Sequence, residues 1–404
     1  MWLGGLLHLA DLSDDATHQK TWIKPYYAAF DGLRGLAIAM VFIDHYSVIA
    51  QPGGSTMGLW TGVDIFFVLS GFLTTGILYD TRQQPRYFRN FFIRRALRIL
   101  PICYGFFLCV LLLTPLLHLV YSRYLWTNPF YASNLYIRGA LLGRHGNPTV
   151  LFIPHKSGIF LQLGALWSLA VEEQFYLVWP FLVWLIPNRK ALMRVCTGIA
   201  GFTVGLRVVL YFCDHAAVAS TNYLYYSTYT RCETLLIGSW LALWLRGSTP
   251  SREAMRRIAR RLMVGSVTVL VILLGIFAKW DLSPFNRVQQ TVGYTLVAFA
   301  GAGLLLRCLD ETSLCHRILL NKAIKRLGII SYGFYFFHGM PSDLFGALAN
   351  RLRPHHLQYL ILPLAFVILY AFASLSFHYF ESYFLRLKGT LAPGHRSVPP
   401  PDPA

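Results

Sequence analysis

The sequence predicts an all-α integral membrane protein, a polytopic helical bundle with about ten transmembrane helices and both termini in the cytoplasm. Of its 404 residues, 55% are hydrophobic and only 13% are charged, and the mean hydropathy is +0.47. A soluble domain carries about a quarter charged residues, so this composition excludes a cytosolic globular enzyme. The 36 Lys and Arg against 18 Asp and Glu give a formal net charge of +18. In a chain this apolar we attribute the excess to basic cytoplasmic loops and expect no nucleic-acid partner.

Ten hydrophobic runs are long enough to cross a bilayer as helices, which takes about 17–25 residues. The loops between them alternate in basic content. Six arginines lie within 82–98, six within 246–261 and five basic residues within 307–326, whereas 214–225 has none. Because basic loops stay in the cytoplasm, this alternation places both termini there. The predicted spans are 29–50, 59–80, 99–121, 165–187, 193–213, 226–245, 262–279, 288–307, 328–349 and 357–381.

The predicted transmembrane domain covers residues 27–388. Residues 1–26 are interpreted as a cytoplasmic N-terminal arm, because their apolar start lacks the basic region and cleavage site of a signal peptide. Residues 389–404 are Pro-rich and are expected to form a disordered cytoplasmic tail. Cys213 and Cys232 flank one predicted outer loop, where a disulfide and two free thiols are both compatible with the sequence. The cysteines lack metal-site spacing, so no metal is expected.

Ionisable side chains inside the predicted spans are costly in lipid and usually mark function, although anchors and structural ion pairs also account for them. Arg34 and His45 are 11 residues apart in the first span, so they share a helix face at a separation of about 16 Å. Asp64 in the second span is expected near the depth of His45 and is the candidate to orient its imidazole. Asp44 points about 100° away from His45 and is a weaker candidate. The alternative makes Arg34 an anchor and His45 a packed interior residue.

Two further spans carry ionisable groups near the predicted outer side. Glu172 and Glu173 lie about two turns inside the fourth span, and we expect Glu172 to face the bundle interior. Arg231 and Glu233 open the sixth span in the same layer, so an ion pair of Arg231 with Glu172 or Glu173 is the structural alternative. His338 in the ninth span is either a packing histidine or a further functional candidate.

The predicted inner side has its own candidate site. Arg95 and Arg98 form an i, i+3 pair on one face at the start of the third span. Basic flanking of a membrane helix explains such residues, but paired guanidinium groups also suit phosphate oxygens. A long donor with phosphates at one end and a reactive group at the other would bridge these arginines and the outer cluster.

These residues lie in segments by which the chain resembles the membrane-bound acyltransferase family 3, whose members O-acetylate surface polysaccharides, peptidoglycan and lipid-linked glycans. The resemblance covers about 27–388 and follows the family order. The segments are FDGLRGLAIAMVFIDH, GVDIFFVLSGFLTTGIL, the Arg-x-x-Arg of Arg95 and Arg98, LWSLAVEEQFYLVWP, TRCETLLIGSWLA, SYGFYFFHGMP and FHYFES.

The resemblance implies roles for individual residues. His45 corresponds to the catalytic histidine with Arg34 as its partner, Arg95 and Arg98 to arginines that handle acyl-CoA, and Glu172 to an acid after Trp-Ser-Leu. It implies no permanently bound cofactor, with acyl-CoA, and acetyl-CoA in particular, as the donor substrate. Some members add an extracytoplasmic SGNH esterase-like domain. The 404 residues hold none, so we expect direct transfer or a separate envelope partner.

Together these features predict a multi-pass enzyme of the cell membrane, an O-acyltransferase with acetyl as the expected group. It would move the acyl group from cytoplasmic acyl-CoA to a hydroxyl of an extracytoplasmic or lipid-linked glycan, with His45 as general base. The alternative is a secondary transporter or flippase-type membrane protein without acyl transfer. Transporters typically have inverted repeats and broken helices, and neither is recognisable in the sequence.

Overall fold

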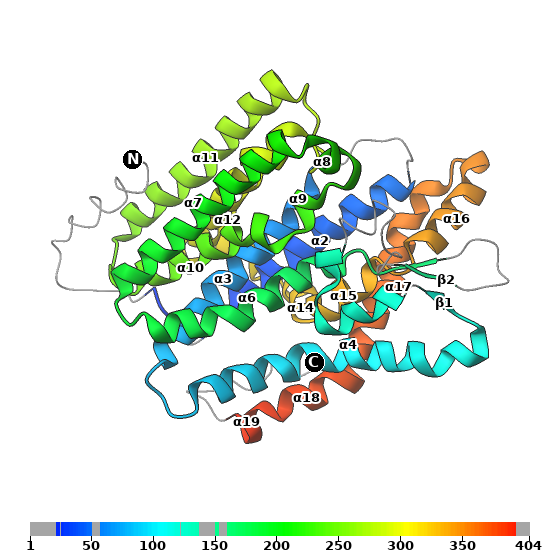
Figure 1. Ribbon diagram of the computed structural model, residues 1–404, viewed down its shortest axis with the longest axis horizontal. Coiled ribbons are helices and arrows are strands. Elements are labelled where there is room, and N and C mark those ends of the chain that lie inside the picture. Colours follow the sequence, from blue (N-terminus) through cyan, green and yellow to red (C-terminus); the bar gives the residue numbers. More distant parts are fainter. Residues whose placement is uncertain are drawn as a thin grey trace.

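The computed structural model describes residues 22–24, 26–50, 57–121, 123–136, 150–152 and 160–392 and is a helical bundle with one small sheet (Figure 1). Seven of the described segments are long and apolar enough to cross a membrane by length and composition. The protein is therefore a multi-pass membrane protein, as the composition predicts. The seven are Ala28–Ala50, Leu59–Thr81, Tyr87–Leu117, Arg189–Cys213, Arg252–Phe277, Gln289–Leu309 and Gln358–Leu391.

The helical elements follow the hydrophobic runs of the sequence. The α-helices are α2 Ala28–Ala50, α3 Gly62–Thr81, α4 Tyr87–Leu117, α6 Leu166–Leu185, α7 Arg189–Cys213, α8 His215–Thr221, α9 Tyr223–Tyr226, α10 Cys232–Leu245, α11 Arg252–Phe277, α12 Tyr294–Leu309, α13 Leu314–Leu319, α14 Lys322–Ile329, α15 Ser331–His338, α16 Ser342–Leu352, α17 Ile361–Ser376, α18 Ser382–Arg386 and α19 Lys388–Leu391. Short 3₁₀ segments are η2 Leu59–Thr61, η3 Arg123–Phe130, η4 Thr228–Thr230, η6 Arg353–His355 and η7 Gln358–Leu360, and π-helical turns are η5 Gln289–Gly293 and η8 Phe377–Glu381.

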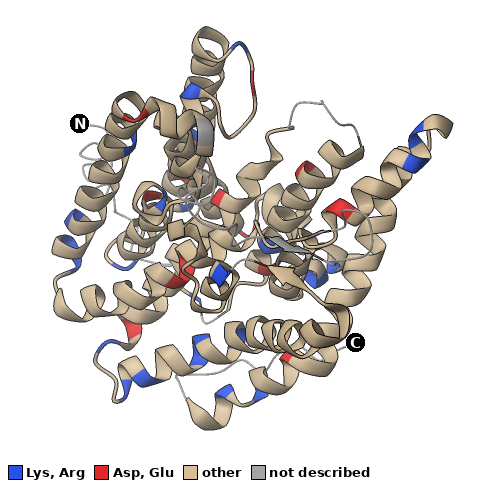
Figure 2. Ribbon diagram, turned by 45° about the vertical axis from the view of Figure 1, so that its right-hand side comes forward, with Lys and Arg blue, Asp and Glu red and all other residues tan. Residues whose placement is uncertain are grey.

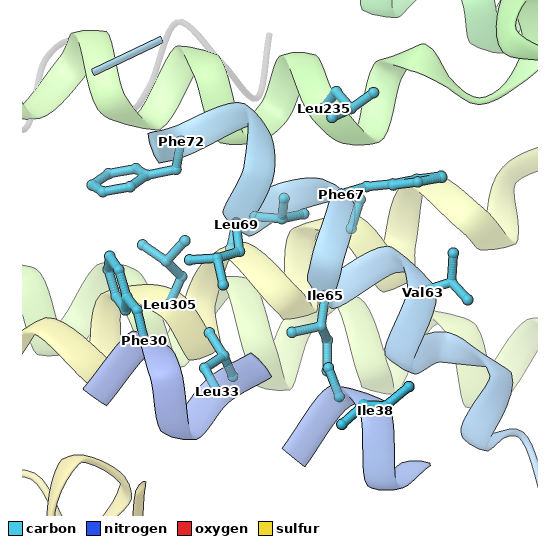
Figure 3. Packing of buried hydrophobic residues seen from close by; sticks show 14 of the residues in the cluster. Phe30, Leu33, Ile38, Val63, Ile65, Phe67, Leu69, Phe72, Leu235 and Leu305 are labelled. Carbon is cyan, nitrogen blue, oxygen red and sulfur yellow. The ribbon is translucent and has the colours of Figure 1, made fainter. Parts of the chain in front are cut away.

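The centre of the bundle is formed by α2, α3, α10 and α12. Figure 3 shows apolar side chains from these four helices meeting in one cluster, with Phe30 and Leu33 of α2 facing Leu69 of α3 and Leu305 of α12. The α3 segment is 72% buried, whereas α11 is only 11% buried. A helix that is apolar all round belongs in the core or against lipid, so α3 is the central helix and α11 a peripheral, lipid-facing one.

Two glycines bring α3 and α10 into close contact. A Cβ at Gly71 would lie 1.9 Å from the carbonyl oxygen of Leu235, and one at Gly238 would lie 2.0 Å from that of Val68. Ser239 Oγ also donates to the Gly71 carbonyl at 3.3 Å. Small residues with a polar side chain between them are the usual means of tight helix packing in membranes. This crossing determines which charged groups meet in the interior.

The predicted ninth span, 328–349, is wrong as a continuous helix. It consists of the end of α14, then α15 and most of α16, and α15 is separated from α16 by Gly339–Pro341. Proline has no backbone N–H to donate and disfavours helix at the residue before it, so the helix stops there. The bundle therefore does contain a broken helix, a feature we did not recognise in the sequence.

Other predicted spans differ at their ends. α4 begins at Tyr87 rather than 99, and α11 at Arg252 rather than 262, because arginine-rich segments are good helix formers and extend the membrane helices. The sixth span is shorter than predicted: 226–231 contains η4, and the helix starts at Cys232. α6 matches the predicted 165–187 closely.

A three-stranded antiparallel sheet lies at the end of the bundle near α16 (Figure 1). The backbone N–H of Gln162 donates to the carbonyl oxygen of Met340 at 3.0 Å, which ties the sheet to the break after α15. The strands are β1 Val120–Tyr121, β2 Val150–Phe152 and β3 Phe160–Gln162.

The expected terminal segments are only partly visible. Most of the predicted arm 1–26 lies outside the described residues, as do residues 393–404 of the predicted tail. The tail prediction is wrong in its first residues, because α19 is helical to Leu391 and the Ala392 carbonyl accepts from Arg94 Nε at 2.9 Å. Cys213 and Cys232 are both free thiols.

Candidate active site

Charged residues are unevenly distributed over the helices. In Figure 2 blue segments follow the helices along the lower and left edges of the view, whereas isolated red and blue segments lie among the central helices. A buried charge is costly unless it is paired, so the central ones need an explanation. The buried acidic, basic and histidine residues of the described chain are Asp31, Asp44, Asp64, Arg207, Arg231, Glu233, Asp310, His338 and Glu381.

Two fully buried ion pairs connect α10 to α3 and α7. Arg231, which precedes α10, places Nη2 2.8 Å from Asp64 Oδ1 of α3, and both side chains are 0% exposed. Glu233 pairs in the same way with Arg207 of α7, again with both side chains 0% exposed. The guanidinium carbon of Arg231 also lies 4.0 Å from the ring centroid of Tyr294. These pairs stabilise the contacts among three helices.

The first pair contradicts two expectations. Arg231 does not pair with Glu172 or Glu173, because the close crossing of α3 and α10 makes the acid on α3 its nearest partner. For the same reason Asp64 does not orient His45: within the described residues no hydrogen bond or ion pair joins them.

His45 is oriented by its own helix instead. Its Nδ1 lies 2.8 Å from the carbonyl oxygen of Val41, one turn earlier. A carbonyl oxygen only accepts, so Nδ1 carries the proton and Nε2 of the neutral ring keeps a free lone pair. The His45 side chain is exposed. Its geometry is that of a base with an accessible Nε2, held without a carboxylate.

His338, at the end of α15, lies next to His45. The two ring centroids are 5.1 Å apart with an interplanar angle of 79°. His338 Nδ1 lies 2.6 Å from the carbonyl oxygen of Tyr335, and its buried Nε2 has no hydrogen-bond partner among the described residues. Tyr46 OH donates to the His338 carbonyl at 2.8 Å. The break after α15 thus places a second histidine with a free Nε2 beside the first.

Three arginines gather at the opposite end of α2. Arg98 of α4 lies within electrostatic range of Arg34, Arg95, Asp31 and Glu381. Arg34 Nη1 lies 2.6 Å from Asp31 Oδ1, whereas Arg98 makes no hydrogen bond or ion pair within the described part of the chain. We call Arg34, Arg95 and Arg98 the arginine cluster. Because the Arg98 guanidinium is not used by another described residue, it can accept an anion.

Tyr26 extends the hydrogen-bonding around Arg34. It precedes α2 and donates its hydroxyl to Asp31. Burial, together with the bond to this carboxylate, raises the pKa of Tyr26 to about 12. The hydroxyl therefore stays protonated and holds Asp31 in place beside Arg34 at any physiological pH.

Glu172 of α6 is the interior acid next to the arginine cluster. Ser70 Oγ donates to its Oε1 at 2.8 Å and Tyr176 OH to its Oε2 at 3.4 Å. Arg95 stacks its guanidinium carbon 4.1 Å from the Tyr176 ring centroid and donates to Thr74 Oγ1. Glu172 lies within electrostatic range of Arg95 and faces the interior, as we expect from the sequence.

The two weaker candidates lie beside this arrangement. Glu173 is within electrostatic range of Arg95 and of Tyr332. Asp44 accepts the backbone N–H of Leu59 at 3.0 Å and thereby holds the start of η2. Asp44 is thus engaged in a loop contact, and its carboxyl group also lies within electrostatic range of His45.

Two contacting groups of side chains lie between the arginine cluster and the histidines: Arg95, Tyr176 and Glu172 form one, and Tyr335, His338 and His45 form the other. Tyr335 is the link: it lies within electrostatic range of Glu172, and its ring centroid is 5.0 Å from that of His338. Its hydroxyl forms a hydrogen bond with Ser168 Oγ. We call the two groups together the polar path; its members in order are Arg95, Tyr176, Glu172, Tyr335, His338 and His45.

Sequence reasoning missed two groups of this site. Tyr335 lies one helical turn before His338, so the i, i+3 spacing of two polar rings in an apolar helix was an available signal. No sequence signal could have identified the Val41 carbonyl, because every residue of a helix carries a main-chain carbonyl.

The fold and site define a multi-pass membrane protein with an interior polar path between a cationic cluster and an accessible histidine. The family model described as an acyltransferase domain matches residues 27–380. The chain therefore belongs to the acyltransferase 3 family and is an acyltransferase by family, as its sequence motifs predict.

Its relatives include O-acetyltransferases. The chain is 29% identical over 333 residues to the peptidoglycan O-acetyltransferase OatA of Listeria monocytogenes, covering 78% of this chain and 49% of the relative. It is 30% identical over 381 residues to the putative peptidoglycan O-acetyltransferase YrhL of Bacillus subtilis, covering 90% and 56%. Identity with the O-acetyltransferase OatA of Staphylococcus aureus is 25% over 338 residues, covering 81% and 52%. The chain spans about half the length of these curated relatives, and no solved structure matches it.

Proposed function

We propose that the chain is a membrane O-acetyltransferase that moves an acetyl group from cytoplasmic acetyl-CoA to a hydroxyl of an extracytoplasmic or lipid-linked glycan. The observation that carries this proposal is the polar path, which lies between a cluster suited to phosphates and a histidine suited to general-base catalysis. The O-acetyltransferase and peptidoglycan names of its relatives support acetyl as the group and a cell-wall glycan as the acceptor.

The proposed topology has ten membrane crossings with both termini in the cytoplasm. Seven crossings are the long apolar segments, and the other three are α6, α10 with its preceding turns, and the interrupted unit α14–α16. The arginine-rich starts of α4 and α11 would then lie in the cytoplasm, in agreement with the preference of basic residues for that side.

The arginine cluster would bind the phosphates of the donor. Arg98 offers a guanidinium without a partner among the described residues, and Arg95 is held by its stack on Tyr176 with its charge still available. Guanidinium groups bind phosphate oxygens in pairs. Arg34 and His45 are about 16 Å apart along α2, a distance comparable to the reach of a pantetheine arm. The thioester would therefore arrive near His45.

At the outer end, His45 would act as general base. Its Nε2 takes the proton of the acceptor hydroxyl while the hydroxyl oxygen bonds to the thioester carbonyl carbon. The tetrahedral intermediate then collapses, the carbon–sulfur bond breaks, and the sulfur takes the proton back from His45 to leave as the thiol. In an acyl-enzyme route the carbon–sulfur bond would break first, as the acetyl group passes to a side chain of the protein. The acceptor hydroxyl would then take the acetyl group from that side chain, with the same net transfer of one proton from the hydroxyl to the sulfur. The ring centroid of His338 lies 5.1 Å from that of His45, so His338 would restrict rotation of the His45 imidazole.

Glu172 would be a positioning residue in this scheme. It fixes Tyr176 through its hydroxyl, and Tyr176 carries the Arg95 guanidinium on its ring face. Glu172→Gln would therefore weaken donor binding more than it changes the chemical step. A raised KM for acetyl-CoA with kcat nearly unchanged is the expected signature.

The test is acetyl transfer by the purified chain. We expect His45→Ala to lower both CoA thiol release and glycan acetylation by about 10²- to 10⁴-fold, the usual contribution of a general base. Because the His45 ring is exposed, the thermal unfolding temperature of the variant should equal that of the wild type. The matched control is His355→Ala, an exposed histidine of η6 remote in sequence from the site, which should leave the rate unchanged.

Two outcomes would contradict the proposal. Full acetyl transfer by His45→Ala would reject the general base. Substrate uptake by the wild type without any CoA release would instead favour a transporter.

A further inference from the structure

A basic groove outside the polar path lies between α11 and α12. Its volume is about 550 Å³, and it opens along the first turns of α11 and the last turn of α12. Four arginines line it, Arg256, Arg257 and Arg260 from α11 and Arg307 from α12. α11 is a peripheral helix of the bundle, so the groove faces the surroundings of the protein rather than the proposed active site.

The positive charge of this groove is not neutralised by the protein. Arg256 is paired with Asp310, Nε to Oδ2 at 2.6 Å. Arg257, Arg260 and Arg307 make no hydrogen bond or ion pair to any residue in the described ranges. Glu253 is the acid among the lining residues, and it cannot balance three free guanidinium groups. Such a groove favours an anion with several acceptor oxygens.

Close helix packing gives the groove an apolar floor. A Cβ at Gly303 of α12 would lie 2.6 Å from Met263 Cγ and 2.7 Å from the Ala259 carbonyl oxygen. The two helices therefore touch directly beneath the arginines. Met263 and Val264 complete the lining at this point, so the groove passes from charged to apolar along α11.

The apolar end continues as an exposed stripe. Val264, Val267 and Val271 are 58%, 49% and 45% exposed. They follow Arg257 and Arg260 at intervals of three and four residues, which places all five on one helix face. From Arg260 to Val271 the stripe runs about 16 Å along the helix axis, which is long enough to accompany most of a fatty acyl chain.

We propose that this groove is a binding site for an anionic phospholipid. The phosphate is held by Arg257, Arg260 and Arg307, and one acyl chain lies along Val264, Val267 and Val271. Other faces of α11 also expose apolar side chains, but Val264, Val267 and Val271 continue directly from the arginines on one helix face, which favours a lipid over a free phosphate or nucleotide. Clusters of basic residues at the membrane surface favour anionic lipids in general; here a built groove between two helices makes the site specific.

The experiment compares lipids on the purified full chain in detergent by native mass spectrometry. Dioleoylphosphatidylglycerol is titrated against dioleoylphosphatidylcholine, with sn-glycerol 1-phosphate as the soluble headgroup. We expect the anionic lipid to bind the wild type, the zwitterionic lipid to bind at least tenfold more weakly, and the soluble headgroup not to bind at the same concentrations. Arg257→Gln/Arg260→Gln should bind the anionic lipid about thirtyfold more weakly, since each arginine near a membrane surface contributes several-fold.

Matched variants separate the site from general charge. Arg261→Gln/Arg194→Gln removes the same charge from two exposed arginines outside the groove and should bind as the wild type does. Val267→Asn should weaken binding of the lipid, because it places an amide on the acyl track.

Three results would overturn the proposal. One is equal lipid affinity in the groove and control variants, and another is equal affinity for the two lipids. The third is binding of the soluble headgroup as tightly as the lipid, which would indicate a free-phosphate site. Because the substituted side chains are exposed, unfolding temperatures measured without added lipid should agree within about 1 °C across the variants, so a binding difference is not a folding defect.

Discussion

The buried Asp64–Arg231 pair gives the sharpest quantitative prediction. Both side chains are 0% exposed and the two atoms Nη2 and Oδ1 are 2.8 Å apart. Removing one member leaves the other charge buried without compensation, which typically costs 3–5 kcal/mol. Arg231 Nε and Nη1 and Asp64 Oδ2 have no hydrogen-bond partner among the described residues, so the pair is imperfectly satisfied. We therefore expect the lower part of that range, about 3 kcal/mol.

The assay is thermal unfolding of the purified protein in detergent. An unfolding entropy of about 2 cal/mol/K per residue makes 3 kcal/mol correspond to a fall of about 4 °C for a chain of this size. Arg231→Gln and Asp64→Asn should each show this fall. The neutral double variant Asp64→Asn/Arg231→Gln should recover most of it, because replacing a buried pair by neutral groups is often close to neutral in free energy.

The same variants distinguish a structural from a catalytic Asp64. If Asp64→Asn kept the wild-type unfolding temperature but abolished acetyl transfer, the carboxylate would act on His45 and the ion pair would not explain its presence. Equal losses of stability in both single variants, with recovery in the double variant, support the pair.

Three further predictions follow from other parts of the structure. Gly71→Ala places a methyl group against an α10 carbonyl and should destabilise the fold by about 1–3 kcal/mol or more. Gly265→Ala on α11 should not, because no atom lies within 4 Å of the added Cβ. Measured unfolding temperatures of the two variants test this difference. Burial alone would raise the pKa of Asp310, but hydrogen bonds, chiefly from Arg256, hold that pKa below its usual value. The stabilisation by the Asp310 carboxylate is thus complete at neutral pH and is lost as pH falls through the lowered pKa. Asp310→Asn should therefore lower the free energy of unfolding by about 1 kcal/mol at pH 7, and its stability should approach that of the wild type below about pH 4. A stability difference independent of pH would contradict this. Arg95→Ala should weaken acetyl-CoA binding about tenfold or more in equilibrium titration, and unchanged affinity would remove Arg95 from the donor site.

The sequence was sufficient for the membrane class and most helix positions because apolar length and basic loops are properties of single segments. It failed where two segments interact. The break after His338 depends on Pro341, a single residue inside an apolar run long enough to predict a continuous span. Regular helix in α10 starts only at Cys232, directly after Arg231, and Arg231 forms the ion pair with α3.

The site was predictable to the same degree. Arg34, Arg95, Arg98, Glu172 and His45 were predicted from polarity in apolar segments. The structure brings Arg34 and Arg95 within electrostatic range of Arg98, and Arg95 and Arg98 within electrostatic range of Glu172. The partners of these groups were not predictable, since pairing requires the depth and rotation of each helix.

The neighbouring positions illustrate this limit. Asp64 and His45 share a predicted depth, but they face different neighbours. Because α3 and α10 cross closely, Asp64 pairs with Arg231. The imidazole of His45 bonds instead to the carbonyl oxygen of Val41 in its own helix.

The central claim is that one chain carries an acetyl group from a cytoplasmic donor to an acceptor on the other side of the membrane. Its most direct measurement uses proteoliposomes with radiolabelled acetyl-CoA, which does not cross the bilayer, sealed inside and the glycan acceptor outside. The account predicts label on the outer glycan, with equimolar CoA thiol retained inside, for the fraction of protein whose arginine cluster faces the lumen. It also predicts loss of both signals in His45→Ala. Labelling of glycan only when donor and acceptor are on the same side would contradict the account.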